Sequence, residues 1–130
     1  MKKLSIKTTA HSQFREITRE VQAALAEIGL RDGAITVFVP HTTAGVTINE
    51  HADPDAMDDV IHALNKLVPW SDPAYRHAEG NSAAHVKAIM TGSSARVLVE
   101  DGNLQLGTWQ GIFFCEFDGP RTREVWIAAG

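Results

Sequence analysis

The chain has 130 residues, 44% hydrophobic and 22% charged, which is ordinary for a single soluble domain spanning residues 1–130. Its net charge of −4 at pH 7 argues against nucleic-acid binding, because binding a polyanion requires a positive field. No stretch approaches the roughly 18 apolar residues of a membrane span, and the single cysteine, Cys115, excludes an intramolecular disulfide and suits a cytoplasmic location.

The first part of the chain predicts a strand, a helix and two more strands. Residues 3–9 alternate between apolar and polar side chains, as a half-exposed strand does. Ser12 can cap a helix that ends at Gly29. The apolar stripe of this helix is Phe14, Ile17, Val21, Leu25 and Ile28. Residues 34–39 are apolar on nearly both faces, which predicts a central strand, and residues 43–49 follow as the next strand.

The second part predicts two helices and then only strands. Asp53-Pro54 is a typical helix start, and Pro69 stops that helix. Residues 70–81 are expected to form a loop, after which Ser82 caps a short helix that ends before Gly92. Four strands are then expected, at residues 96–100, 104–106, 109–118 and 123–128.

This order of elements predicts the fold class. Clustered strands joined by short turns pair with their neighbours, so the expected fold is α+β with a mostly antiparallel sheet and about three helices. The chain contains no internal repeat or low-complexity linker.

Three of the six histidines occupy positions where functional groups are common. His41 follows a strand end, His77 lies in the predicted loop, and His85 lies near the start of the next helix. Three imidazoles with one open position form a common catalytic zinc site. The spacing matches no local ligand motif, so separate hydrogen-bonding roles for these histidines are the alternative.

Two acidic residues lie in otherwise apolar strands. Glu50 closes one strand beside Asn49, and Glu116 lies within another. A carboxylate in such a place costs free energy unless it is paired, hydrogen-bonded or part of a site, so both are candidate proton-transfer groups. The alternative is that each strand simply exposes that face at its end.

Two arginines follow the turn at Gly119-Pro120. Arg121 and Arg123 are two residues apart on a strand, so both side chains point the same way and can hold one phosphate or carboxylate. Equally, they can pair with Glu116 or Asp118 across the hairpin.

A tryptophan between glycines marks the start of the same hairpin. Trp109 can stack on a flat ligand, with Gln110 and Asn49 as further substrate-binding candidates, or it can pack in an interface. Cys115 lies within the strand, far in sequence from any histidine, and is expected to be a structural thiol.

Four segments resemble, in order, the signatures of the YjbQ-like family. They are residues 38–50, residues 75–77 with 79–87, residues 106–112 and residues 116–123. The resemblance extends over residues 4–127. It implies a curved, mostly antiparallel, β-sandwich-like sheet and a homotrimer, for which Trp109 and the strand 109–117 are the candidate interface.

The resemblance also implies a chemistry. Members of the family resemble metal-binding proteins whose histidines align with His41, His77 and His85. The family is often labelled secondary thiamine-phosphate synthase, a weak activity that joins a hydroxymethylpyrimidine diphosphate to a thiazole phosphate and releases diphosphate. Three histidines favour zinc, whereas a diphosphate substrate makes magnesium an alternative.

Residues and resemblance together lead to one hypothesis and one alternative. The hypothesis is a metal-dependent enzyme for a small phosphorylated or anionic substrate, in which Arg121 and Arg123 hold the anion and Glu50 or Glu116 transfers a proton. The alternative is a non-catalytic trimeric module that binds a metal or a ligand. An open metal position beside one of the two acids distinguishes the enzyme from the module.

Overall fold

The computed structural model describes residues 1–130 as eight strands and three helices. In chain order they are β1 (Lys2–Lys7), β2 (Gln13–Glu16), α1 (Thr18–Ile28), β3 (Gly33–Phe38), β4 (Ala44–Glu50), α2 (Pro54–Leu67), α3 (Ser82–Thr91), β5 (Ser94–Glu100), β6 (Asn103–Gln105), β7 (Gln110–Glu116) and β8 (Thr122–Ala129). All strand pairs are antiparallel, so the predicted α+β class with three helices is confirmed.

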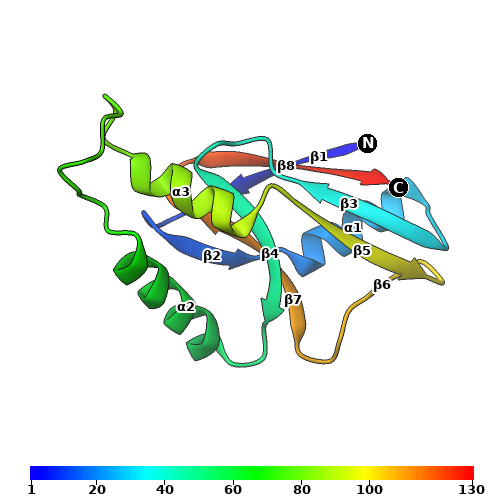
Figure 1. The fold of residues 1–130 in the computed structure, drawn as a ribbon. Coiled ribbons are helices and arrows are strands. Elements are labelled where there is room, and N and C mark those ends of the chain that lie inside the picture. The colour runs from blue at the N-terminus through cyan, green and yellow to red at the C-terminus, as the bar shows by residue number, and fades with distance from the viewer.

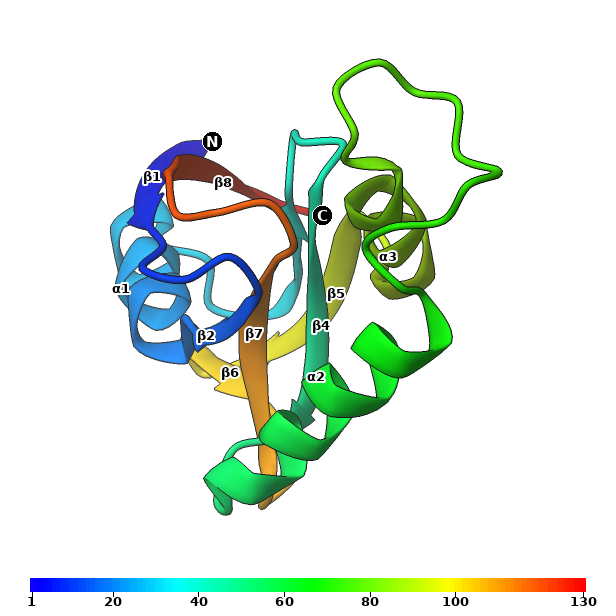
Figure 2. The same cartoon turned by 90° about the vertical axis from the view of Figure 1, so that its left-hand side faces the viewer.

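The strands form two sheets rather than one. A five-stranded sheet has the order β1-β8-β3-β5-β6, and a three-stranded sheet has the order β2-β7-β4 (Figure 1). The larger sheet curls around α1, while α2 and α3 cover the other side of the three-stranded sheet (Figure 2). The main core therefore lies between α1 and the two sheets.

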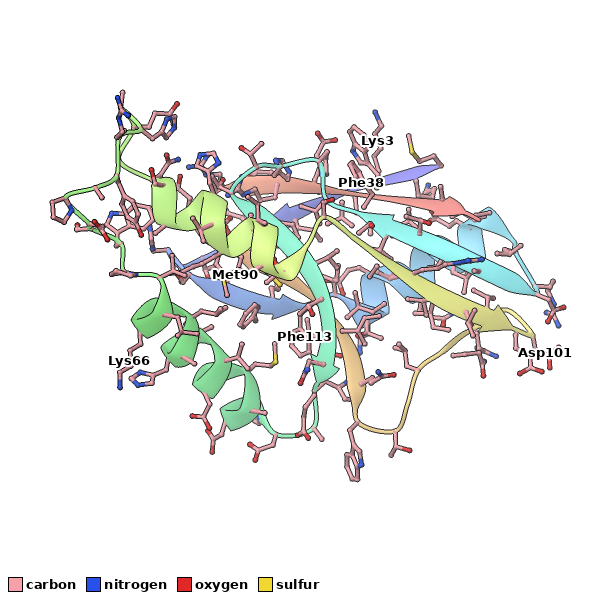
Figure 3. All side chains as sticks on the ribbon, viewed as in Figure 1. Lys3, Phe38, Lys66, Met90, Asp101 and Phe113 are labelled. Carbon is pink, nitrogen blue, oxygen red and sulfur yellow. The ribbon has the colours of Figure 1, made fainter.

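The central strand β7 is buried on both faces because it lies between this core and the two outer helices. Ile112 and Phe114 belong to the main core, while Cys115 and Phe117 pack in a smaller cluster against α3. Phe113 points from β7 toward α2 (Figure 3). Burial raises the pKa of the Cys115 thiol far above its ordinary value, in keeping with a structural thiol.

The predicted helix start at Ser12 is wrong. Residues 13–16 form strand β2, which pairs with β7, and the helix begins at Thr18. The three-residue step from Phe14 to Ile17 fits a helix, but the edge of β7 offers unpaired backbone groups that an extended segment satisfies. Thr18 completes the change of direction, because its Oγ1 accepts the backbone N–H of Ile112 at 2.9 Å.

The β4–β7 pair has two distinct ends. Ala44 lies opposite Glu116 at one end and Glu50 lies opposite Gln110 at the other. Six residue steps separate the two ends, which corresponds to about 20 Å along the strands. Gly45 allows β4 to approach the end of α3, because a Cβ at that position would collide with Thr91.

None of the three helices has the length and apolar character needed to cross a membrane; the longest, α2, has 14 residues.

Candidate functional site

A polar cavity of about 470 Å³ lies where β4 begins and β7 ends. Eleven residues line it, and no hydrophobic residue is among them. They include all three predicted histidines, His41, His77 and His85, and both predicted arginines, Arg121 and Arg123. The structure thus brings five sequence-predicted site residues to one place.

The histidines reach the cavity from different segments. His41 lies in the loop after β3, His77 in the loop before α3, and His85 near the start of α3. The rings of His77 and His85 are in edge contact, with centroids 5.2 Å apart. The Nε2 atom of His41 accepts the backbone N–H of Glu124 at 2.9 Å, which leaves its Nδ1 atom available for a ligand.

The environment of His41 favours its neutral form. Burial lowers the pKa of this imidazole, and the charge of Arg123 lowers it further. A neutral imidazole is the form that binds metal ions.

The donor set is that of a zinc site, but its present arrangement is not a closed ligand cage. No three His, Cys, Asp or Glu side chains are grouped closely enough to hold a metal ion. The rings of His77 and His85 are in contact. His41 lines the same cavity but does not form a three-residue ligand group with them. Metal binding by the three histidines therefore stays a prediction.

A fully buried ion pair lies beneath the cavity. Glu116 is 0% exposed and Arg123 is 4% exposed. The Nε of Arg123 donates to Glu116 Oε1 at 2.9 Å, and its Nη2 donates to Oε2. Thr8 Oγ1 donates to Oε1 at 2.8 Å, and the backbone N–H of Asp118 donates to Oε2 at 3.0 Å. Burial alone raises the pKa of Glu116, but these hydrogen bonds outweigh it and hold the pKa below its ordinary value.

The second arginine is tied to the same hairpin. Arg121 Nε donates to the Asp118 carbonyl oxygen at 2.9 Å, and its Nη2 lies 3.3 Å from Asp118 Oδ2. Arg123 Nη2 also donates to Thr43 Oγ1 at 2.9 Å. Both arginines therefore make the hairpin pairings that the sequence left as the alternative, while still lining the cavity.

One lining residue has an unsatisfied buried atom. Asn81 donates from Nδ2 to Asp118 Oδ2 at 2.9 Å, but its Oδ1 is buried without any partner. Such an acceptor costs roughly 1–3 kcal/mol when it is unpaired, so a donor group or cation in the cavity would be favourable here.

Sequence reasoning missed several polar residues that line this cavity. They are Thr42, Thr43, Glu79, Asn81 and Asp118. All lie in the segments that resemble the family signatures, which was the available signal. Glu79 is exposed and has no hydrogen bond or ion pair in the structure.

The other predicted residues lie at the far end of the β4–β7 pair. Glu50 Oε2 accepts the backbone N–H of Asp53 at 3.1 Å, and Asn49 Oδ1 accepts the backbone N–H of Glu50 at 2.8 Å. Gln110 Oε1 accepts the Gly107 N–H at 2.8 Å. The neighbouring residue Trp109 is 64% exposed. Within one chain, these four residues are not brought to the histidines.

Comparisons with known proteins cover nearly the whole chain. A model of the family described as UPF0047 protein YjbQ-like matches residues 2–129. UPF0047 protein YugU of Bacillus subtilis is 54% identical over 127 residues, covering 98% of this chain and 96% of that protein. UPF0047 protein MJ1081 of Methanocaldococcus jannaschii is 46% identical over 127 residues, covering 96% and 90%. The crystal structure of an uncharacterised YjbQ/UPF0047 protein of Clostridium acetobutylicum matches with a TM-score of 0.96 at 50% identity and covers 100% of both chains.

Proposed function

The chain belongs to the UPF0047 YjbQ-like family, and from that premise we propose that it is a metal-dependent enzyme acting on a small phosphorylated or anionic substrate in the polar cavity. The names of its relatives carry no activity, so the proposal rests on the site. The observation that carries it is the placement of three imidazoles and two guanidiniums around one cavity without hydrophobic lining.

The charges of the lining support a requirement for a metal. The lining has two guanidiniums and two carboxylates, and Arg123 is also paired with the buried Glu116, so with neutral histidines the cavity has no excess of positive charge. We assign the metal to the three histidines, with zinc as the ion that imidazoles favour and magnesium as the alternative for a diphosphate. When bound, a divalent metal supplies the positive charge that attracts and polarises a phosphate.

The chain's own residues have separate roles in this proposal. Arg121 is half exposed, so its guanidinium can turn from Asp118 to a substrate phosphate. Arg123 is held by Glu116 and Thr43, so its role is to fix the buried wall of the cavity. Asn81 Oδ1 accepts a hydrogen bond from a donor group of the substrate.

The resemblance suggests a reaction in which diphosphate leaves, namely a weak thiamine-phosphate synthase activity. Arg121 and the metal would hold the departing diphosphate. The proton-transfer role predicted for Glu116 meets an obstacle, since its carboxylate is already bonded to Arg123, Thr8 and Asp118. Glu79 is the cavity carboxylate that has no hydrogen bond or ion pair, so we assign the proton-transfer role to it within one chain.

We further propose that the protein is a homotrimer with the site near a subunit boundary. Large exposed hydrophobic residues supply an interface: Ile89 is 80% exposed, Met90 52% and Leu98 62%, besides the exposed Trp109. In a trimer, Glu50 and Trp109 of one subunit could line the polar cavity of a neighbouring subunit.

Light scattering tests the trimer directly. At micromolar concentration the expected mass is three times the 14.2 kDa of one chain. Ile89→Glu should lower that mass, because a carboxylate in an apolar interface lacks a partner. A wild-type mass of one chain would contradict the trimer.

The non-catalytic alternative has one observation in its favour. Neither predicted acid, Glu50 or Glu116, lines the polar cavity, so within one chain the available carboxylates are Glu79 and Asp118, and Asp118 is already paired with Arg121. A protein that binds metal and diphosphate but turns over no phosphorylated substrate, with Glu79→Gln unchanged in every assay, would be such a module.

Calorimetric titration with diphosphate tests the proposed substrate class. We expect diphosphate to bind in the presence of Zn²⁺ and much more weakly after the metal is removed by a chelator. Arg121→Gln should weaken binding by about tenfold, the effect of losing a charge-assisted hydrogen bond. Arg31→Gln is the matched control, because Arg31 pairs with Asp101 on the exposed surface. Equal affinity in both variants, or no binding by the wild type, would reject the substrate assignment.

A further inference from the structure

A second cavity, of about 550 Å³, lies on the other side of α3 from His85. Lys87 lines it, and two residues along a helix correspond to a rotation of roughly 200°, so these two side chains point to opposite faces. The remaining lining residues are His11, Ser12, Asn65, Pro69 and Trp70. None of the six is acidic, in contrast to the polar cavity described above, although Nε2 of His11 lies 3.8 Å from Oδ1 of Asp118.

The lysine of this cavity is a buried cation without a counter-ion. Lys87 is 3% exposed, and its Nζ donates to Asn65 Oδ1 at 2.6 Å. No carboxylate forms an ion pair with it, although an ammonium has three protons to donate. A buried charge is normally paired with an opposite charge, and the neutral amide of Asn65 does not supply one to the Lys87 ammonium.

The neighbouring residues add further donors and an aromatic surface. Ser12 Oγ lies 3.5 Å from Nδ1 of His11, at the same cavity. The ring of Trp70 meets the His11 ring edge-on, with centroids 4.4 Å apart, and is 39% exposed. The Trp70 indole is therefore held in place by His11 while part of it stays open to a ligand.

We propose that this cavity is a second ligand site, which binds a flat aromatic molecule carrying a carboxylate or phosphate group. The anionic group binds Lys87, with His11 and Ser12 as additional donors, and the ring packs on Trp70. The two linings share no residue, and the contact between them is that of His11 Nε2 with Asp118 Oδ1 at 3.8 Å, so the proposal does not depend on the function proposed for the polar cavity.

Phenyl phosphate is the probe, and the indole N–H of Trp70 is the reporter. The chain has three tryptophans, and the indole resonance that disappears in Trp70→Phe is that of Trp70. Phenyl phosphate should shift the Trp70 resonance, and inorganic phosphate should bind more weakly because it lacks a ring. Benzoate in a parallel titration shows whether a carboxylate or a phosphate is preferred. Trp70 contacts His11, and His11 contacts Asp118 of the polar cavity, so a shift of the Trp70 resonance counts as binding at this site only where Lys87→Met or Asn65→Asp weakens it.

Two variants test the role of Lys87. Lys87→Met keeps the length of the side chain but removes the charge, and it should raise the dissociation constant for phenyl phosphate by at least about tenfold. Asn65→Asp places a carboxylate on the ammonium and should weaken binding to a similar extent. Asn65 is an exposed residue, so this second variant decides the question if Lys87→Met does not fold.

Lys66→Met is the matched control, because Lys66 points away from the protein on α2 (Figure 3) and should leave binding unchanged. The proposal is overturned if phenyl phosphate at millimolar concentration does not shift Trp70, or if affinity is retained in both Lys87→Met and Asn65→Asp. Equal affinity for inorganic and phenyl phosphate would overturn the stacking on Trp70.

Discussion

Replacing Glu116 with glutamine is expected to lower the free energy of unfolding by about 3–5 kcal/mol, because it leaves the buried guanidinium of Arg123 without its counter-charge. Urea denaturation at neutral pH measures the change. The carboxylate also fixes Thr8 and the backbone of Asp118, so the loss extends to the loop beneath the polar cavity. No other ion pair in the molecule is comparably buried.

Two comparisons separate the ion pair from a general effect of substitution. Glu27→Gln removes the exposed pair with Lys2 and should cost less than about 1 kcal/mol. The double variant Glu116→Leu with Arg123→Met should be less destabilised than the sum of its single changes, because the two charges interact. A loss below about 1 kcal/mol in Glu116→Gln would mean that the pair contributes little.

The pH dependence of stability provides a further readout of the same variant. The pKa of Glu116 is lower in the folded protein than in the unfolded chain, so the ionised carboxylate stabilises the fold above its unfolded pKa. This contribution is lost as the pH falls through the lowered folded value, below about pH 4. Glu116→Gln should therefore lose less stability than the wild type between neutral and acid pH.

Removing His85 or His77 is expected to raise the dissociation constant for Zn²⁺ by more than about 100-fold, since even loss of a group that only orients a ligand costs about 10–100-fold. The two rings are already in contact, so each alanine variant removes half of the adjacent pair. Competition with a chromophoric chelator measures the affinity. His41→Ala should have a similar effect if its Nδ1 completes the ligand set.

His62→Ala is the matched control, because His62 is exposed on α2 and lies outside the polar cavity. It should bind zinc like the wild type. A wild-type protein that fails to bind one equivalent of Zn²⁺ per chain, or histidine variants that bind as tightly as His62→Ala, would exclude the three-histidine metal site. Diphosphate binding that persists without any metal would then assign the cavity to its arginines alone.

The local chemistry of the sequence determined most of the helix boundaries. Asp53 Oδ1 accepts the backbone N–H of Asp55 at the start of α2, as a capping residue before a proline should. Gly29 adopts the left-handed conformation, with φ of 77°, after α1. These features depend on neighbours within a few residues. Strand β2 did not follow from the sequence, because its formation depends on an edge of β7 about a hundred residues later in the chain.

The sequence also identified five of the eleven residues that line the polar cavity, namely the three histidines, Arg121 and Arg123. What it could not decide was which polar side chains meet. Alternation along a strand tells which face a side chain occupies, but it does not tell which end of the sheet lies near another segment. The sequence alone therefore leaves both Glu50 and Glu116 as proton-transfer candidates, and the register of β4 and β7 places them at opposite ends.

Only the tertiary structure decided that Glu116 and Arg123 form a buried pair rather than two separate functional groups. Their partner Thr8 is 108 residues from Glu116 in sequence, and Thr43 is 80 residues from Arg123. Such contacts arise when β1, β8 and the start of β4 pack together and exclude water. The exclusion of water strengthens the attraction within an ion pair, and it also makes an unpaired charge there costly in free energy. The sequence supplied the charges, and the burial that determines their effect is a property of the packed chain.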